Sequence, residues 1–311
     1  MTRVLLITPA RDEAAYLENT IRAVAAQSRP PDLWLIVDDG SSDETPRILE
    51  RLEAELPFLE TMRAPGHAES RGRDGLAIAA EARAFNAALA NVDADEFTHI
   101  GKLDADIELP PDYLEGLLGR FAAEPRLGVA GGTLLERCGG EWRPTSAPAH
   151  HVRGALKLYS RECFRTIGGI EERLGWDTID EIYARMHGYA THSFSELVAR
   201  HHRPVATRGG ALRGRARLGR CAYILRYSPW WVALKSARVA TSPPYVLGGI
   251  AYFWGYLRPA VGDRHNRVED PEFAHFVTAE LRNRARPTAV ARAISDRGRK
   301  GMKVSPNSRR S

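Results

Sequence analysis

The sequence predicts an α/β fold in which helices flank a central, mostly parallel sheet, with a helical appendage at the C-terminus. Short apolar segments alternate with helical patterns through the first 121 residues. Polar residues follow three of the apolar segments, at positions 8–13, at Asp38 and Asp39, and at Asp104 and Asp106. Since ligands of such sheets bind beyond the carboxyl ends of the strands, these residues predict a nucleotide site in one crevice.

Each element has a pattern that predicts it. Strands are expected where apolar and β-branched residues run together, and helices where apolar residues recur at every third or fourth position. Thr45 as the N-cap and Pro46 at the first helical position mark one helix start, and Asp12 marks another. In chain order, we expect a strand over 4–8, a helix from Asp12 that buries Leu17, Ile21 and Val24, a strand over 33–37, a helix over 45–56, a helix over 76–90, a strand that ends at Asp104 and a helix over 111–121.

Composition excludes several classes of protein. The chain of 311 residues can bury a large core, and its three cysteines form no C-x-x-C pair, which fits a reducing compartment and no zinc site. Neither G-x-G-x-x-G after the first strand nor a P-loop is present, and no secretory signal is visible, so we expect a cytoplasmic protein without a dinucleotide fold. The net charge of +5 comes mostly from 208–220 and from Arg282 onward, so we assign it to an attached surface and expect no nucleic-acid partner.

Asp104 and Asp106 are the strongest candidates for a metal site. Two carboxylates at the end of a buried strand can hold Mg²⁺ or Mn²⁺ against a nucleotide diphosphate, whose charge the ion neutralises. The alternative is that both aspartates cap the next helix or stay in solvent. Lys102, just before them, is expected to be an exposed strand residue, with a phosphate contact as the alternative.

Five segments occur in an ordered series: TPARDEAAYLENTI, LIVDDGSSDET, ARAFNAAL, KLDADIELPPDYLE and the stretch at 158–189. Together they resemble the family 2 inverting glycosyltransferases, which use nucleotide-sugar donors. The resemblance implies a single GT-A type, Rossmann-like domain. It also implies a metal-dependent, hexosyltransferase-like transfer of a sugar, with inversion, from a nucleotide-diphosphate donor to a hydroxyl acceptor. The acceptor would be a carbohydrate or a lipid-linked molecule, as in polysaccharide or glycolipid synthesis.

The resemblance also implies roles for individual residues. Asp104 would face the nucleotide's sugar or the metal, and Asp106 would ligate the ion directly. For Asp38 and Asp39 the alternative is that they only cap the turn at Gly40. For Arg83 the alternative is a position on a solvated helix face. The residues expected at the nucleotide are Thr8, Pro9, Arg11, Glu13, Asp38, Asp39, Arg83, Asn86 and Asp104.

An inverting transfer needs a general base that deprotonates the acceptor hydroxyl. Family members carry this base in a Glu-Asp pair, and Trp176 stands here where Glu is usual. Counting back from Gly188 points to Asp177, whereas counting back from Arg185 comes closer to Asp180. We expect Asp177 to be the base and keep Asp180 as the alternative, with Asp177 as a plain helix N-cap as the other interpretation. Trp176 is expected either to stack on an acceptor sugar or to pack in the core.

Two histidines end a later apolar stretch, in the sequence ARHHRP. In some relatives of this fold a histidine here supplies a third metal contact, so His202 is a candidate ligand. Arg203 is a candidate phosphate contact. The alternative is that these side chains belong to the surface.

The last hundred residues differ in character from the rest. We divide the chain into a catalytic domain over 1–207 that binds the nucleotide sugar, a basic and aromatic helical segment over 208–281, and a disordered basic tail over 282–311. The apolar stretch 245–257 is too short to span a bilayer. Tryptophans and tyrosines beside arginines predict a helix pair at an anionic membrane surface, which would make the protein peripheral. A helical subdomain packed on the catalytic domain is the alternative.

Two other functions compete with sugar transfer. A sugar nucleotidyltransferase would use a similar sheet, but the first strand lacks the Gly-rich loop that holds a triphosphate. A non-catalytic relative that binds nucleotide or lipid would keep the fold, and the altered sequence around Asp177 gives this alternative its support.

Overall fold

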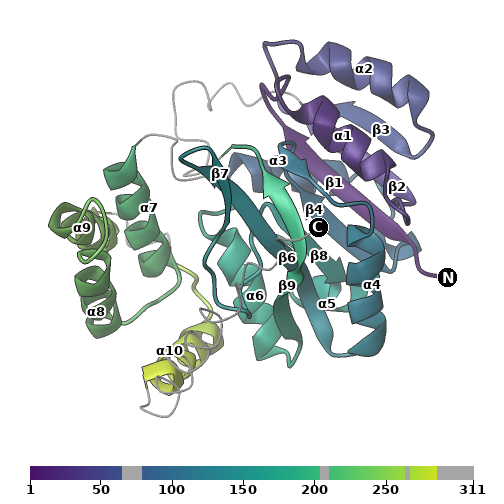
Figure 1. The fold of residues 1–311 in the computed structure, drawn as a ribbon. Coiled ribbons are helices and arrows are strands. Elements are labelled where there is room, and N and C mark those ends of the chain that lie inside the picture. Colours follow the sequence, from purple (N-terminus) through teal and green to yellow (C-terminus); the bar gives the residue numbers. More distant parts are fainter. Residues whose placement is uncertain (65–78, 204–209, 263–266, 286–311) are drawn as a thin grey trace, which may run out of the picture. The chain divides into compact units, whose positions relative to one another are not determined.

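The computed structural model describes residues 1–64, 79–203, 210–262 and 267–285, and the chain divides into two compact units, Met1–Gly214 and Arg215–Ser311 (Figure 1). The expected three-part functional division of the chain stays a prediction. Helix α10 includes residues 282–285, and the rest of the predicted tail lies outside the described residues.

Unit 1 is built on a nine-stranded sheet with the order β3-β2-β1-β4-β8-β6-β9-β5, and β7 pairs with β6 (Figure 1). Strands β1 to β4 are mutually parallel, β8 runs antiparallel to both β4 and β6, and β9 is parallel to β6. The predicted α/β fold with a mostly parallel sheet is therefore confirmed. The strands are β1 (Val4–Ala10), β2 (Leu33–Asp38), β3 (Leu59–Arg63), β4 (His99–Leu103), β5 (Ile107–Glu108), β6 (Leu127–Cys138), β7 (Glu141–Pro144), β8 (Leu156–Ser160) and β9 (Ala190–His201).

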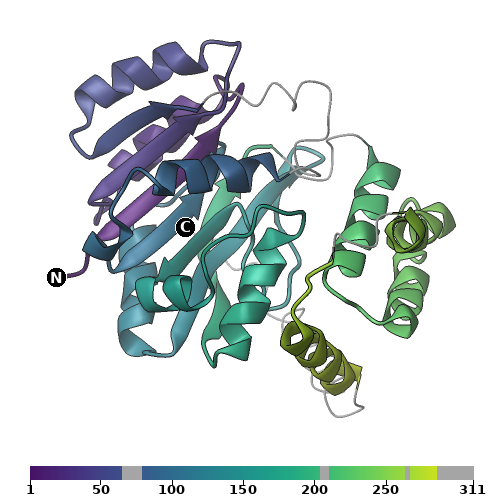
Figure 2. The ribbon, with the colours of Figure 1, turned by 180° about the vertical axis from the view of Figure 1, so that it is seen from behind.

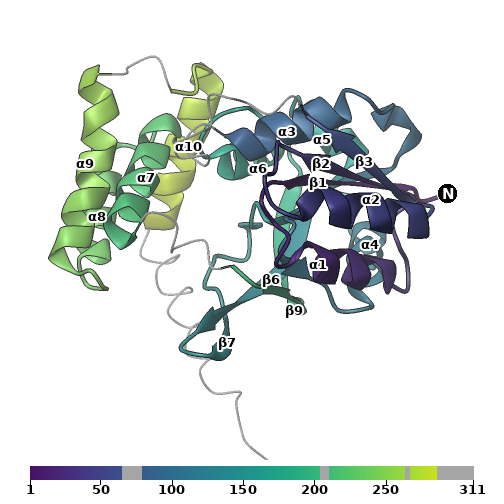
Figure 3. The ribbon, with the colours of Figure 1, turned by 90° about the horizontal axis from the view of Figure 1, so that it is seen from above.

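Helices cover both faces of this sheet. Figure 3 shows α1, α2 and α4 on one side of the strands and α3, α5 and α6 on the other, and Figure 2 shows α3 crossing the second face. Successive side chains of β1 point to opposite faces of the sheet, which explains why helices pack on both. Val4 and Leu6 join the apolar cluster on one face, while Leu5 and Ile7 join the cluster on the other. The helices are α1 (Leu17–Ala25), α2 (Thr45–Glu55), α3 (Ala80–Leu89), α4 (Tyr113–Ala123), α5 (Arg161–Thr166) and α6 (Trp176–Met186).

Two predicted helix starts are wrong. Helix α1 begins at Leu17, five residues after Asp12, because Asp12 adopts a left-handed backbone conformation (φ 53°) and its carboxylate accepts a hydrogen bond from the N–H of Ser42. Thr45 is the first residue of α2 and not its cap. Of the helix expected over 76–90, residues 76–78 lie outside the described residues.

Unit 2 contains most of α7 (Ala211–Ile224) together with α8 (Pro229–Val239), α9 (Val246–Gly262) and α10 (Pro271–Ala285). Its core is largely aromatic, with Tyr223, Tyr252 and Tyr256 around Val232. Helices α7 and α9 approach closely through glycines: a Cβ on Gly219 would lie 1.9 Å from the carbonyl oxygen of Tyr252. Within the described segments, no helix combines the length and the apolar character that crossing a membrane requires.

We expect Gly219→Ala to destabilise unit 2 by about 1–3 kcal/mol, because the added methyl must separate α7 from α9. Gly214→Ala, in the same helix but with nothing within 4 Å of the added carbon, is the control and should be neutral or stabilising. Thermal unfolding followed by tryptophan fluorescence tests this, since Trp230, Trp231 and Trp254 lie in unit 2. Equal melting temperatures for the two variants would contradict close helix packing at Gly219.

Candidate active site

Two carboxylates and an imidazole converge beyond the carboxyl end of β4. Asp104 directly follows β4, Asp106 precedes β5, and His201 ends β9. Strand β5 pairs with β9 so that Ile107 faces His201, and the N–H of His202 donates to the carbonyl of Asp106 at 3.0 Å. One ligand atom from each of Asp104, Asp106 and His201 lies within 4.8 Å of the other two, so a single ion has room to contact all three.

The chemistry of this group fits a divalent metal. Carboxylate oxygens suit Mg²⁺ and Mn²⁺, and an added imidazole favours a transition metal such as Mn²⁺. Asp106 and His201 are buried while Asp104 is partly exposed, so a ligand can reach the group from solvent on the Asp104 side. The group is therefore a candidate metal site.

The histidine of this group is His201, whereas the sequence analysis favoured His202. The His202 ring bonds the carboxylate of Glu108 at 3.0 Å and stacks on Tyr16 with ring centroids 5.5 Å apart. Successive side chains of an extended strand point to opposite faces, so only one of two adjacent histidines can face Asp106. Which one does so depends on the register of β5 against β9, which the sequence does not reveal.

His201 lies between two carboxylates. Its Nε2 is 3.3 Å from Asp106 and its Nδ1 is 3.6 Å from Glu136. Burial lowers the pKa of His201, but the two carboxylates outweigh burial and raise the pKa to about 9. The metal-free site therefore holds an imidazolium near neutral pH, and an ion that binds His201 must displace its proton.

Lys102 is buried, which contradicts the expected exposed position. Its ammonium pairs with Asp104 and, at 3.1 Å, with Glu81 of α3. Burial raises the pKa of Asp104 to about 6, although the charge of Lys102 acts in the opposite direction. Lys102 thus supplies a fixed positive charge directly behind the candidate metal site.

Three of the residues predicted at the nucleotide lie where β1 and β2 end. The guanidinium of Arg11 is 3.9 Å from Asp39, and Asp38 accepts a hydrogen bond from the N–H of Ser41 at 2.8 Å. Asp38 therefore caps its turn, which was the alternative role, and it also lies 3.7 Å from Arg63. Both aspartate side chains are almost fully buried.

Other predicted nucleotide residues have structural roles. The buried Thr8 hydroxyl accepts a hydrogen bond from the Trp34 indole at 3.0 Å, and Pro9 lies within the central strand β1. Glu13 forms a two-pronged ion pair with Arg203, with bonds of 3.0 and 2.5 Å. This pair joins the residues after β1 to those after β9, so Arg203 is engaged by Glu13 in this structure.

Arg83 and Asn86 lie on α3, on the sheet face that also carries α5 and α6. The side-chain amide of Asn86 donates to the carbonyl of Ile170 at 2.9 Å and to Glu172 at 3.1 Å. Asn86 therefore anchors the loop that precedes α6. Arg83 is half-buried.

The two candidate bases differ sharply in environment. Gly175 caps α6 with a left-handed φ of 87°, so Asp177 lies in the first turn and is not the N-cap. The Asp177 side chain is partly exposed. Asp180 is buried, accepts two hydrogen bonds from Lys157 at 2.9 and 2.8 Å, and bonds the Tyr159 hydroxyl. A carboxylate held in this way has no free approach for an acceptor hydroxyl.

Lys157 organises the start of α6. Besides Asp180, its ammonium contacts Glu181 at 3.3 Å and donates to the main-chain carbonyl of Asp177 at 2.5 Å. Trp176 is buried, with the ammonium groups of Lys157 and Lys102 5.5 and 5.2 Å from its ring centroid. The indole therefore packs in the core, which was one of its two predicted positions. Sequence reasoning expected Lys102 to be exposed and did not consider Lys157, although charged residues inside apolar strands are a detectable signal.

We expect Lys157→Met to lower the free energy of unfolding by about 3–5 kcal/mol, because it leaves Asp180 buried without its cation, whereas Glu181 keeps Arg185 and His151 as neighbours. Adding Asp180→Asn to this variant should restore part of the loss, since the uncompensated charge of Asp180 disappears. Urea unfolding of the wild type, both single variants and the double variant measures the coupling. Additive effects of the two substitutions would show that the ion pair contributes nothing.

Comparison with known proteins agrees with this architecture. A Synechocystis β-monoglucosyldiacylglycerol synthase is 26% identical over 206 residues, which cover 60% of this chain and 40% of that protein. The Haloferax volcanii glycosyltransferase AglD is 28% identical over 168 residues, or 52% of this chain and 25% of AglD. The chain thus spans less than half the length of either relative.

Solved structures share the fold at low identity. A Pyrobaculum calidifontis mannosyltransferase aligns over 97% of this chain and 81% of its own, with a TM-score of 0.53 and 19% identity. Staphylococcus aureus TarS 1-349 aligns over 90% and 82%, with a TM-score of 0.52 and 14% identity. Residues 5–169, slightly more than half of the chain, match the glycosyl transferase family 2. The chain belongs to glycosyl transferase family 2.

Proposed function

We propose that the protein transfers a hexosyl group from a nucleotide-diphosphate sugar to a hydroxyl acceptor, with inversion and with the help of a divalent cation. The observation that carries this proposal is the convergence of Asp104, Asp106 and His201 beyond the carboxyl ends of the strands. A donor diphosphate requires charge neutralisation at this edge of the sheet, and the three side chains suit a cation there.

The cation would be Mn²⁺ or Mg²⁺. Asp106 and His201 would bind it, Asp104 would bind it or the nucleotide's sugar, and the bound ion would neutralise charge that develops on the leaving diphosphate. The Pyrobaculum structure was solved with GDP-Man and Mn²⁺, and a TarS structure with UDP-GlcNAc, which supports a nucleotide-sugar donor. We replace His202 by His201 as the third ligand because His202 is bonded to Glu108.

The nucleoside would lie where β1 and β2 end. Asp39, buried beside Arg11, suits a hydrogen bond to a base N–H or to a ribose hydroxyl. Asp38 would act indirectly, by holding the turn that positions Asp39. Thr8 would likewise support the site from within the core.

Asp177 would be the general base. Its partly exposed side chain suits proton transfer from an acceptor hydroxyl, whereas Asp180 is enclosed by Lys157 and Tyr159. Lys157 would position the base through the main-chain carbonyl of Asp177. Trp176 stands where relatives in the family carry an acidic residue beside the base. It is buried near Lys102 and Lys157, and it places no negative charge next to Asp177.

The acceptor would be a carbohydrate or a lipid-linked molecule. The Synechocystis relative is named for the synthesis of a glycolipid, which supports glycolipid or polysaccharide synthesis. We also propose a cytoplasmic location with peripheral contact to an anionic membrane, because residues 211–262 carry eight lysines or arginines and no acidic residue. Failure to float with anionic vesicles would count against this contact.

Asp106→Asn should abolish stabilisation by nucleotide and metal together. A diphosphate at about 100 times its Kd raises the free energy of unfolding by about 2.7 kcal/mol, and this gain requires the ion that Asp106 holds. A thermal-shift panel of nucleoside diphosphates, with and without Mn²⁺, measures the gain. Asp112→Asn, an exposed aspartate after the same loop, is the matched control and should respond like the wild type. A shift that survives in Asp106→Asn would refute the metal assignment.

Asp177→Asn should lower turnover by about 10²–10⁴-fold while leaving nucleotide binding intact, because a general base contributes about that factor. The rate of turnover with donor and acceptor tests the role of the base. The anomeric configuration of the product, determined by NMR, tests inversion. Asp180→Asn is the comparison and should mainly lower stability, since Asp180 is the buried partner of Lys157. Unchanged turnover in Asp177→Asn would assign the base elsewhere.

A further inference from the structure

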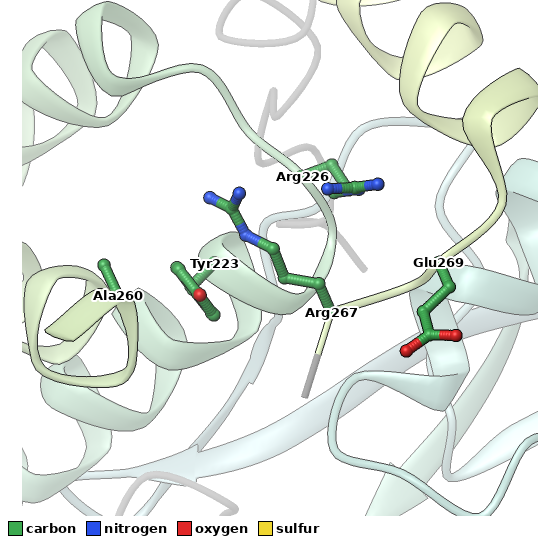
Figure 4. A pocket seen from close by; sticks show the side chains of 5 residues that line it. All are labelled: Tyr223, Arg226, Ala260, Arg267 and Glu269. Carbon is green, nitrogen blue, oxygen red and sulfur yellow. The ribbon is translucent and has the colours of Figure 1, made fainter. Parts of the chain in front are cut away.

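A small pocket lies within unit 2. Its volume is about 350 Å³, and it is lined by Tyr223 of α7, Arg226 just after α7, Ala260 of α9, and Arg267 and Glu269 before α10 (Figure 4). The volume falls at the lower end of ligand pockets and suits a small polar group. Two arginines in one small pocket indicate a negatively charged ligand.

The charge of Arg226 has no acidic partner among the residues that the structure describes. Within the described residues its side chain forms no ion pair, and its buried Nε donates no hydrogen bond. Figure 4 shows the carboxylate of Glu269 pointing away from the guanidinium groups of Arg226 and Arg267. Arg267 lies over Tyr223, with its guanidinium carbon 4.1 Å from the ring centroid. The pocket therefore combines one guanidinium that lies over Tyr223 with another that has no counter-ion in the described part of the chain.

The backbone at Arg226 is also unusual. Arg226 adopts a left-handed conformation (φ 60°) and ends α7 in a Schellman turn, in which Tyr227 N–H bonds the carbonyl of Ala222 and Arg226 N–H that of Tyr223. Glycine is the usual residue at this position, because a side chain there costs about 1 kcal/mol. An arginine at a position that favours glycine is consistent with a role for its side chain.

An exposed apolar face borders the pocket. Residues on α9 recur every three or four positions and are strongly exposed, namely Val246 (64%), Ile250 (59%), Trp254 (62%), Leu257 (37%) and Val261 (82%). Helix α8 adds Trp230 (48%) and Leu234 (57%). Ala260, which lines the pocket, directly precedes the exposed Val261, so α9 contributes to both the pocket and this apolar face. Such a face, flanked by cations and free of acids, fits the interfacial region of a bilayer.

We propose that the pocket binds the phosphate group of an anionic phospholipid headgroup while the exposed face of α9 lies against the acyl chains. This inference rests on the proposed membrane contact and deepens it by naming the site. Arg226 offers paired N–H donors that match phosphate oxygens, and Arg267 adds charge from its position on Tyr223. The tryptophans of α8 and α9 lie at the headgroup level, where such rings are favoured.

Arg226→Gly tests the site without threatening the fold, because glycine relieves the left-handed conformation and should keep or raise the melting temperature. Flotation with phosphatidylcholine vesicles, with and without phosphatidylglycerol, is the measurement. The wild type should bind the anionic vesicles, and Arg226→Gly should bind them at least about five-fold more weakly, since one basic contact near the surface contributes about 1 kcal/mol. Arg238→Gln removes the same charge from the exposed end of α8 and should have a smaller effect.

The outcomes separate the possible failures. Equal losses in Arg226→Gly and Arg238→Gln, or no loss in Arg226→Gly, would overturn the pocket assignment and leave only general charge attraction. Stabilisation of the wild type by inorganic phosphate, absent in Arg226→Gly and without vesicle binding by either protein, would assign the pocket to a soluble phosphate and overturn the lipid assignment. Stabilisation by Mn²⁺ and a nucleotide depends on residues of unit 1. Measuring it in the wild type and in Arg226→Gly therefore tests the proposed transfer reaction separately from the lipid site.

Discussion

Two buried lysines stand opposite each other where β4 pairs with β8, and much of unit 1 is arranged around their charges. Lys102 and Lys157 are direct cross-strand partners, and both ammonium groups approach the ring of Trp176. Like charges at such a position destabilise a sheet, and an uncompensated buried ion costs several kcal/mol. The carboxylates that offset them come from the candidate metal site, at Asp104, and from α6, at Asp180. Charge compensation in the core therefore ties the proposed donor site to the helix that carries the proposed base.

This coupling has a consequence for the chemistry. Asp104 is shared between Lys102 and the candidate metal site, so the ion would bind beside a fixed positive charge and next to a donor diphosphate. The His201 imidazole is held between Asp106 and Glu136, which favour its protonated form until an ion replaces the proton. Two protein cations, Lys102 and His201, therefore already lie beside the carboxylates of the candidate metal site.

Unit 2 depends on a different constraint. Gly219 and Gly255 allow α7 and α9 to touch main chain to main chain, since a Cβ at either position would lie within about 2 Å of a carbonyl oxygen. This close approach buries the glycine-bearing side of α9 and leaves Ile250, Trp254 and Leu257 outward. The same geometry that stabilises the helix pair therefore creates the exposed apolar face from which we infer the lipid site.

The alternation of apolar runs and helical patterns was enough to predict β1, β2, β4 and helices on both faces of the sheet, because that periodicity is local in the chain, but it did not predict β3. The carboxylates after β2 and β4 were also readable, since parallel strands end at a common edge. Only the tertiary structure decided which of two adjacent histidines faces Asp106, which carboxylate near the start of α6 is enclosed, and which carboxylates pair with Lys102. These outcomes depend on strand register and on partners far apart in sequence, such as Lys157 and Asp180, and a single sequence carries no local signal for either.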